Sequence, residues 1–228
     1  MQNERLTVLV TGCDRGIGAE FVRQYAANGA NVIALGLEQD AGRPKPEGRV
    51  EYYQLDVTDH QAVEKLGDGL SDRTIDILIN NAGIGGPHPA FGRTDYDLWR
   101  KMLEVNLLAP LKLTEVLIER VAESALKTIV FISSRMGSIG LNNSGASYAY
   151  RSSKAGLNMV AKSLAVDLAW RGVCVLSLHP GRVEPSTNSS VAALSVERSV
   201  SEMRDIISRA GPHQTGAFLS HTDQLLPW

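Results

Sequence analysis

The chain has 228 residues, a length that suits one large domain with a sizeable hydrophobic core. Charged residues make up 21% of the sequence and the formal net charge is −2, which argues against nucleic acid or an anionic membrane surface as a partner. No apolar run is long enough to span a membrane, and the first residues lead straight into a strand-like run, so we expect no signal peptide.

The cysteine and histidine content indicates the cellular compartment and whether a metal site is expected. Two cysteines are too few for a disulfide framework and fit a reducing compartment, so we expect a cytoplasmic protein. The five histidines show no metal-ligand spacing, and we therefore predict no metal site.

The first predicted unit is a strand, a glycine-rich turn and a helix. Leu6–Val10 is a short apolar run, as expected of a parallel strand covered on both faces. In the turn Thr11–Gly18 the glycines are spaced Gly-x3-Gly-x-Gly, and a helical pattern follows. Glycines let the backbone approach a pyrophosphate, whose charge is favoured at a helix N-terminus. The spacing differs from Gly-x-Gly-x2-Gly, so the turn indicates a dinucleotide site only through its place on the first strand.

Six further strand-like runs alternate with segments in which apolar residues recur at helical spacing. The predicted strands are 31–35, 50–55, 75–79, 128–132, 173–178 and 216–220. The longest predicted helices are 95–121, with a local break at Pro110, and 150–171. No shift in composition marks a second domain. Residues 1–228 are therefore expected to form one α/β domain around a doubly wound, mostly parallel seven-stranded sheet flanked by helices.

Small and polar residues stand where several predicted strands end. Asn80–Gly83 follow the fourth strand, Ser133 and Ser134 the fifth, and His179–Gly181 the sixth. Open α/β sheets bind ligands at this carboxyl edge. The second strand ends in Gly36–Glu38, which fits cleanly neither the pattern of an acid that reads the ribose of NAD nor that of a basic group for NADP.

Tyr150 and Lys154 open the helical pattern at 150–171. Four residues apart, they would lie on one helix face, where an ammonium lowers the pKa of a phenol from about 10 toward neutral pH. Such a proton donor is what carbonyl reduction needs. Tyr148 has only Ser152 at the same spacing. Two surface tyrosines at a helix start would explain this stretch equally well.

Taken together, these motifs resemble the short-chain dehydrogenase/reductase family. The matching pieces, in family order, are Thr11-Gly12-x3-Gly16-x-Gly18, Asp56-Val57, Asn80-Asn81-Ala82-Gly83, Asn106, Ser134, Tyr150-x3-Lys154 and Pro180-Gly181. Within the family, 133–139, 148–154 and 177–181 are similar to the C-factor-like and Sniffer-like carbonyl reductases. The resemblance implies a Rossmann-type NAD(P)-binding domain that acts on a small-molecule carbonyl or alcohol.

It also implies catalytic roles. Tyr150 would be the general acid in reduction and the base in the reverse direction, and Lys154 would lower its pKa and bind the nicotinamide ribose. Ser134 would polarise the substrate oxygen, and Asn106 would hold a water that relays protons to Lys154. Ser133 would point to the opposite side of its strand, and Ser144 or Ser147 would reach the site only if the loop 137–147 folds over it.

The cofactor-binding residues implied by the resemblance fall into four groups. They are Gly12, Asp14, Arg15, Gly16, Ile17 and Gly18 around the pyrophosphate; Asp56 and Val57 at the adenine; Asn80, Ala82 and Gly83 on the adenosine side; and Tyr150, Lys154, Pro180, Gly181 and Val183 at the nicotinamide end.

The sequence departs from the family in two places. Leu37 stands where an arginine for a 2′-phosphate is expected, which leaves Arg15 as the main basic candidate. The absence of an acid at Gly36 argues mildly against NAD(H), although Glu38 could reach a ribose hydroxyl, so we expect only a slight preference for NADP(H). The threonine usual after Pro-Gly is missing, so either Ser186 or Thr187 replaces it or the lid over the cofactor is arranged differently.

Two functions remain open: an NAD(P)-dependent oxidoreductase of a carbonyl/alcohol pair, and a dinucleotide-binding sensor or signalling protein with little turnover. The substrate walls are expected from 84–94, 137–147 and 184–200. A homodimer, a homotetramer and a monomer are all compatible with the sequence.

Overall fold

A seven-stranded sheet forms the centre of the computed structural model, which describes residues 5–38, 48–183 and 194–228. The strand order is β3-β2-β1-β4-β5-β6-β7, and every pairing between neighbouring strands is parallel. The strands are β1 (Thr7–Thr11), β2 (Asn31–Gly36), β3 (Arg49–Gln54), β4 (Ile77–Asn80), β5 (Thr128–Ile132), β6 (Cys174–His179) and β7 (Ala217–Ser220). The predicted sheet is confirmed, with strand ends that move by no more than two residues.

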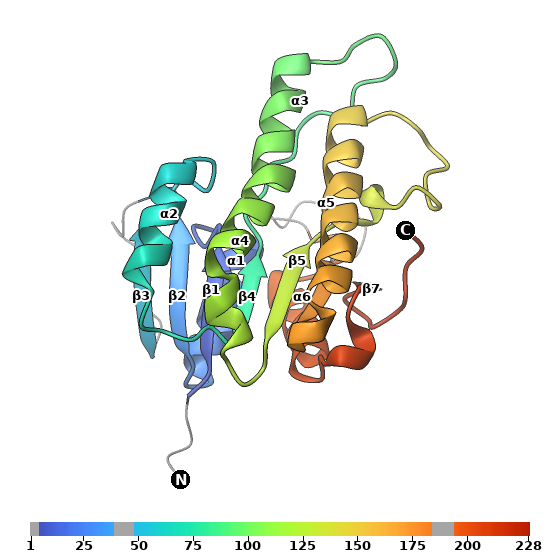
Figure 1. The fold of residues 1–228 in the computed structure, drawn as a ribbon. Helices are drawn as coiled ribbons and strands as arrows, with labels where there is room; N and C mark the ends of the chain where they lie inside the picture. The colour runs from blue at the N-terminus through green and yellow to red at the C-terminus, as the bar shows by residue number, and fades with distance from the viewer. Residues whose placement is uncertain (1–4, 39–47, 184–193) are drawn as a thin grey trace.

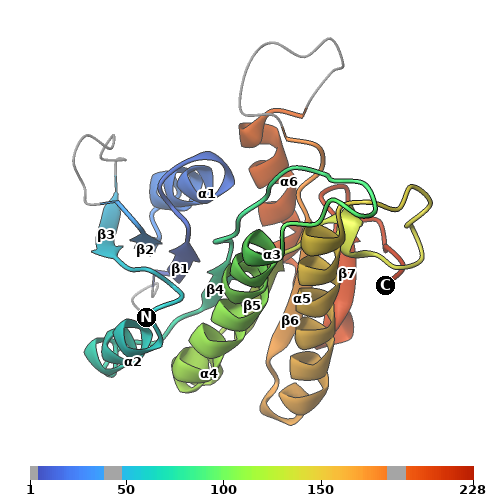
Figure 2. The same ribbon diagram turned by 90° about the horizontal axis from the view of Figure 1, so that it is seen from above.

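Helices cover both faces of this sheet, as Figures 1 and 2 show. The helices α1 (Gly16–Ala27) and α6 (Val196–Ser208) lie on one face. The other face carries α2 (His60–Gly69), α4 (Ala109–Ala122) and α5 (Tyr148–Asp167), with α3 (Tyr96–Leu103) leading into α4. The fold is doubly wound, because the helices that connect the parallel strands lie on both faces of the sheet.

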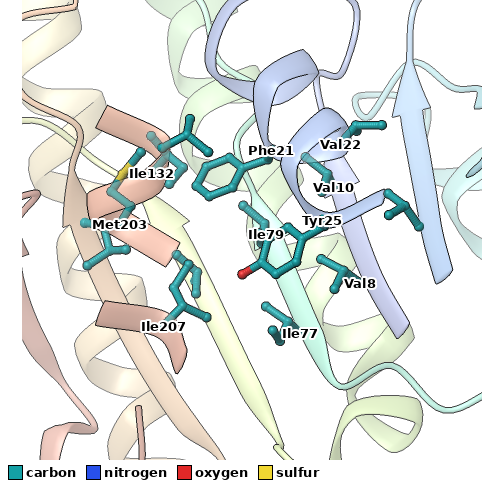
Figure 3. Packing of buried hydrophobic residues seen from close by; sticks show 14 of the residues in the cluster. Val8, Val10, Phe21, Val22, Tyr25, Ile77, Ile79, Ile132, Met203 and Ile207 are labelled. Atoms are coloured by element: carbon teal, nitrogen blue, oxygen red, sulfur yellow. The ribbon is translucent and has the colours of Figure 1, made fainter. Parts of the chain in front are cut away.

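Two hydrophobic layers fill the space between sheet and helices. In the first, Phe21 and Tyr25 of α1 pack over β1 and β4, beside Met203 and Ile207 of α6 (Figure 3). The second layer lies on the opposite face of the sheet, beneath α2, α4 and α5. It contains the fully buried Phe131 of β5. The strands are therefore apolar on both faces, which explains why they are continuous apolar runs in the sequence.

The predicted helix 95–121 is continuous but irregular. A π-helical turn, Glu104–Leu108, separates α3 from α4, and Pro110 stands at the start of α4. Proline has no N–H and disfavours a regular helical turn before it. The local break expected at Pro110 is confirmed, and it is this π-helical turn. The irregular turn contains Asn106, whose side chain is completely buried.

No helix in the described part of the chain is both long and apolar enough to cross a membrane.

Candidate active site

The carboxyl ends of the central strands bring the predicted catalytic residues together. Ser134 is the second residue after β5, Tyr150 and Lys154 lie in the first two turns of α5, and Asn106 lies in the π-helical turn before α4. A Cβ atom built on Gly83, after β4, would stand 3.2 Å from Asn106 Oδ1 and 3.5 Å from Lys154 Nζ. Residues far apart in the sequence thus share one end of the sheet.

Tyr150 is half-buried, and the Ser134 side chain lies close enough to influence its pKa. Burial raises the pKa of Tyr150 above its ordinary value of 10, and the neighbouring Ser134 hydroxyl lowers it in part. The sequence predicts that Lys154 lowers this pKa. In the chain itself the net effect is upward, because desolvation of the phenolate outweighs the other influences.

Lys154 is only 5% exposed, and its Nζ donates a hydrogen bond to the Ile132 carbonyl oxygen at 2.9 Å. Burial lowers the pKa of Lys154 from 10.5 to about 8, because the charged ammonium loses its hydration. At pH 7 the amine therefore still carries a proton. The side chain is held at the end of β5, one helical turn from Tyr150.

Asn106 holds the backbone that follows β4. Its Oδ1 accepts from Ile84 N at 2.8 Å, and its Nδ2 donates to Ile84 O at 2.9 Å and to Ser153 Oγ at 3.0 Å. These bonds tie the π-helical turn both to the loop after β4 and to α5. Asn106 is thus a buried asparagine whose side chain binds backbone, and the predicted water relay stays a prediction.

The other serines considered for the carbonyl-polarising role have different partners. Ser133 Oγ donates to Asn158 Oδ1 at 2.6 Å, on the α5 side of the strand. Ser147 Oγ lies 2.8 Å from His88 Nδ1, and Ser144 Oγ accepts from Arg151 at 2.8 Å. Among the serines considered, Ser134 is the one whose hydroxyl influences the pKa of Tyr150.

The glycine-rich turn fits a dinucleotide pyrophosphate. Gly12 has φ +65°, and a Cβ atom there would lie 2.8 Å from Ala82 Cα. A Cβ atom on Gly18 would lie 2.1 Å from the Gly12 carbonyl oxygen, so α1 packs directly on the turn. By contrast, a Cβ atom on Gly16 would meet nothing within 4 Å. No side chain caps the N-terminus of α1, which leaves this open space beside N–H groups that suit an anion.

The end of β2 carries an acid that comes from the glycine-rich turn. Asp14 Oδ2 accepts from Leu37 N at 3.0 Å and Oδ1 from Glu38 N at 3.2 Å. A Cβ atom on Gly36 would stand 2.3 Å from Asp14 Oδ1, so only glycine fits beneath the carboxylate. Reading β2 alone misses this acid, because it lies 22 residues earlier in the chain than Gly36. Arg15 beside it is exposed.

The remaining predicted cofactor residues lie along the same edge. Asp56 Oδ1 accepts from the Thr58 amide and hydroxyl, Asn80 is buried beside Thr114, and the Ala82 amide donates to Thr11 Oγ1 at 2.8 Å. The other predicted cofactor residues also lie next to the strands and helices. They are Ile17 and Gly18 at the start of α1, Val57 after β3, Gly83 after β4, and Pro180, Gly181 and Val183 after β6. Ser186 and Thr187 lie outside the described residues.

A group of titratable side chains surrounds the turn after β6. His221 Nδ1 lies 2.5 Å from Glu202 Oε2, and a Cβ atom built on Gly181 would lie 2.7 Å from the His221 ring. Burial and the positive charges of Arg135 and His221 lower the pKa of His179 to about 4. His179 is therefore neutral at pH 7. No group of three or more potential metal ligands occurs among the residues with described positions.

An apolar cavity of about 220 Å³ lies between the loop after β5 and the first turns of α5. Met136 and Ile139 line it, as does Arg151. Arg151 and the other α5 residues that line the cavity lie on a different face of the helix from Tyr150 and Lys154. Phe91, in the expected wall segment 84–94, is 88% exposed, and Trp99 Nε1 of α3 donates to Ser152 Oγ at 2.8 Å.

Comparison with known proteins identifies the family. The sequence model described as short chain dehydrogenase matches residues 6–194. The C-signal protein of Myxococcus xanthus is 36% identical over 154 residues, covering 68% of this chain and 93% of its own. The 1-hydroxy-2-glutathionyl-2-methyl-3-butene dehydrogenase of a Rhodococcus species is 35% identical over 228 residues, covering 97% and 99% of the two chains.

Solved structures agree with the sequence relatives. The carbonyl reductase Sniffer of D. melanogaster superposes with a TM-score of 0.87 at 26% identity, over 99% of this chain and 100% of that one. An NADPH-bound carbonyl reductase from chicken fatty liver has the same TM-score and coverage at 27% identity. The chain therefore belongs to the short-chain dehydrogenase/reductase family, in its Sniffer-like branch, and is an NAD(P)-dependent oxidoreductase.

Proposed function

We propose that the chain reduces a small-molecule carbonyl to an alcohol, or catalyses the reverse, with Tyr150 as the general acid or base. The observation that carries this proposal is that the Ser134 hydroxyl lies close enough to Tyr150 to lower its pKa, one helical turn from the buried Lys154. When bound, the nicotinamide coenzyme supplies or accepts the hydride. The chain supplies the position of the substrate and the proton.

Each residue then has one task. The Ser134 hydroxyl donates to the substrate oxygen, where negative charge grows during reduction, and Tyr150 delivers the proton to the same oxygen. Lys154, protonated below its pKa of about 8, places a positive charge beside the phenol that becomes a phenolate.

For Asn106 we assign the relay water to its main-chain carbonyl. Its side-chain amide is already bonded to Ile84 and Ser153. Pro110, four residues later, has no N–H with which to close an α-helical bond to that carbonyl. A water on this oxygen would connect the lysine to solvent.

We propose NADP(H) as the preferred coenzyme. The exposed Arg15 in the glycine-rich turn and the absence of an acidic side chain at Gly36 support it, and the NADPH-bound chicken liver enzyme shows that this fold accepts NADPH. The Asp14 carboxylate at the end of β2 opposes a 2′-phosphate, which keeps the expected preference small.

Exchange of Tyr150 for phenylalanine tests the assignment. Tyr150→Phe is expected to lower turnover of ketones, aldehydes or quinones by roughly 100-fold or more while the coenzyme still binds. Tyr148→Phe is the matched control, because this neighbouring tyrosine is 39% exposed and should leave turnover unchanged. Full turnover in Tyr150→Phe would contradict the role. Coenzyme binding by the wild type without turnover of any carbonyl would favour the sensor.

A further inference from the structure

The end of β5 is fastened to α5 by more than the residues that react. Lys154 and Asn158 lie one turn apart on the same face of α5, and both are buried. Lys154 Nζ donates to the Ile132 carbonyl, and Asn158 Oδ1 accepts from the hydroxyl of Ser133, the next residue along. Asn158 Nδ2 also donates to the Gly137 carbonyl at 3.4 Å. Asn158 thus bonds to the chain on both sides of Ser134.

The Ser133–Asn158 bond is the short one of this set, at 2.6 Å, and joins two side chains that are each only 3% exposed. Neither group can exchange its partner for bulk water without moving. Gly137 adds a steric limit, since a Cβ atom there would lie 2.8 Å from the Lys154 backbone carbon. These contacts fix the position of the turn that carries Ser134 relative to α5.

We propose that Asn158, through Ser133, is a positioning residue that sets the distance between Ser134 and Tyr150. Among the described residues, the Ser134 side chain forms a hydrogen bond only within its own turn, where Oγ accepts from Met136 N at 3.1 Å, and its hydroxyl lies close enough to Tyr150 to lower the pKa of that phenol. Its place opposite Tyr150 must come from what holds the turn, and Asn158 is the side chain of α5 that bonds to both ends of it. This inference rests on the proposed function only for its catalytic consequence.

Three variants separate positioning from stability. Asn158→Leu leaves the Ser133 hydroxyl buried without a partner, and Ser133→Ala does the same to the amide oxygen of Asn158, so each loses stability. In the double variant both polar groups are gone and much of that stability is expected to return. If Asn158 and Ser133 had a purely structural role, turnover should return in the double variant together with stability. A positioning role keeps turnover at least roughly tenfold below wild type in all three.

Ser124→Ala is the matched control. Ser124 is also a buried serine whose hydroxyl donates to a carbonyl, that of Val121 at 2.9 Å, but it lies beyond the end of α4. It should lose stability and keep turnover. Coenzyme affinity, measured by fluorescence titration, should change little in any of these variants.

A second readout requires no turnover. The ultraviolet difference titration between a protein and its Tyr150→Phe derivative reports the ionisation of Tyr150 alone. A looser Ser134 no longer stabilises the phenolate, so Asn158→Leu and the double variant should ionise at higher pH than wild type. Tyr150 titration and turnover both equal to wild type in the double variant would overturn the proposal. An inactive wild type with the expected titration shift would instead contradict the proposed reaction and leave the positioning role supported.

Discussion

Lys154 should destabilise the folded chain at neutral pH, and this can be measured. Its pKa falls from 10.5 to about 8 on burial. Between these two values the unfolded chain binds more protons than the folded one, so the free energy of unfolding rises with pH. At roughly 1.4 kcal/mol per pH unit, the protonated lysine costs the fold about 3 kcal/mol at pH 7. At pH 10 the cost falls below about 1 kcal/mol.

Replacement by methionine removes this cost and also one hydrogen bond. Lys154→Met keeps the length of the side chain but leaves the Ile132 carbonyl without its donor, a loss of about 1 kcal/mol. The variant is therefore expected to be about 2 kcal/mol more stable than its parent at pH 7, equivalent to about 4–8 °C in Tm for a chain of this size. At pH 10 the advantage should vanish, and turnover should be lost at both values.

The assay is urea unfolding at pH 7 and pH 10, without coenzyme, in a Tyr150→Phe background so that the phenol does not titrate. Lys101→Met is the control, because Lys101 is an exposed lysine on α3 and its exchange should have no pH-dependent effect. If the stability difference between Lys154→Met and its parent is the same at both pH values, Lys154 does not titrate near 8 and the reasoning fails.

Two further substitutions test the nucleotide site. Asp14→Asn removes the charge at the end of β2 but keeps an acceptor for the Leu37 amide, so NADPH should bind several-fold more tightly relative to NADH; an unchanged ratio of the two Kd values would contradict the proposed repulsion. Gly18→Ala places a Cβ atom 2.1 Å from the Gly12 carbonyl oxygen and should lower the unfolding free energy by about 1–3 kcal/mol and weaken coenzyme binding. Gly69→Ala at the end of α2, with nothing within 4 Å, should do neither.

The sheet could be predicted from the sequence because each strand is buried on both faces. Thr128–Ile132, for example, is buried at every position, and only a continuous apolar run satisfies that environment. Tyr150 and Lys154 could be paired for a similar reason, since the period of a helix places residues four apart on one face. Local periodicity carries these features.

What could not be predicted depends on contacts between distant segments. Asp14 reaches the end of β2 only because the glycine-rich turn folds against Gly36. Asn158 belongs to the helical row of Tyr150 and Lys154, so its face could be inferred, but its partner Ser133 is 25 residues away. The π-helical form of the turn at Asn106 also has no local sequence signal beyond Pro110.

Burial acts in opposite directions on the two titrating groups of the site. It raises the pKa of Tyr150 and lowers that of Lys154, so it works against forming the phenolate and the ammonium side by side. The charged pair therefore depends on neutral polar groups beside both residues, the Ser134 hydroxyl near Tyr150 and the Ile132 carbonyl bonded to Lys154. Both polar groups belong to the same end of β5. We therefore expect the bonds that hold this strand end to α5 to control proton exchange by Tyr150.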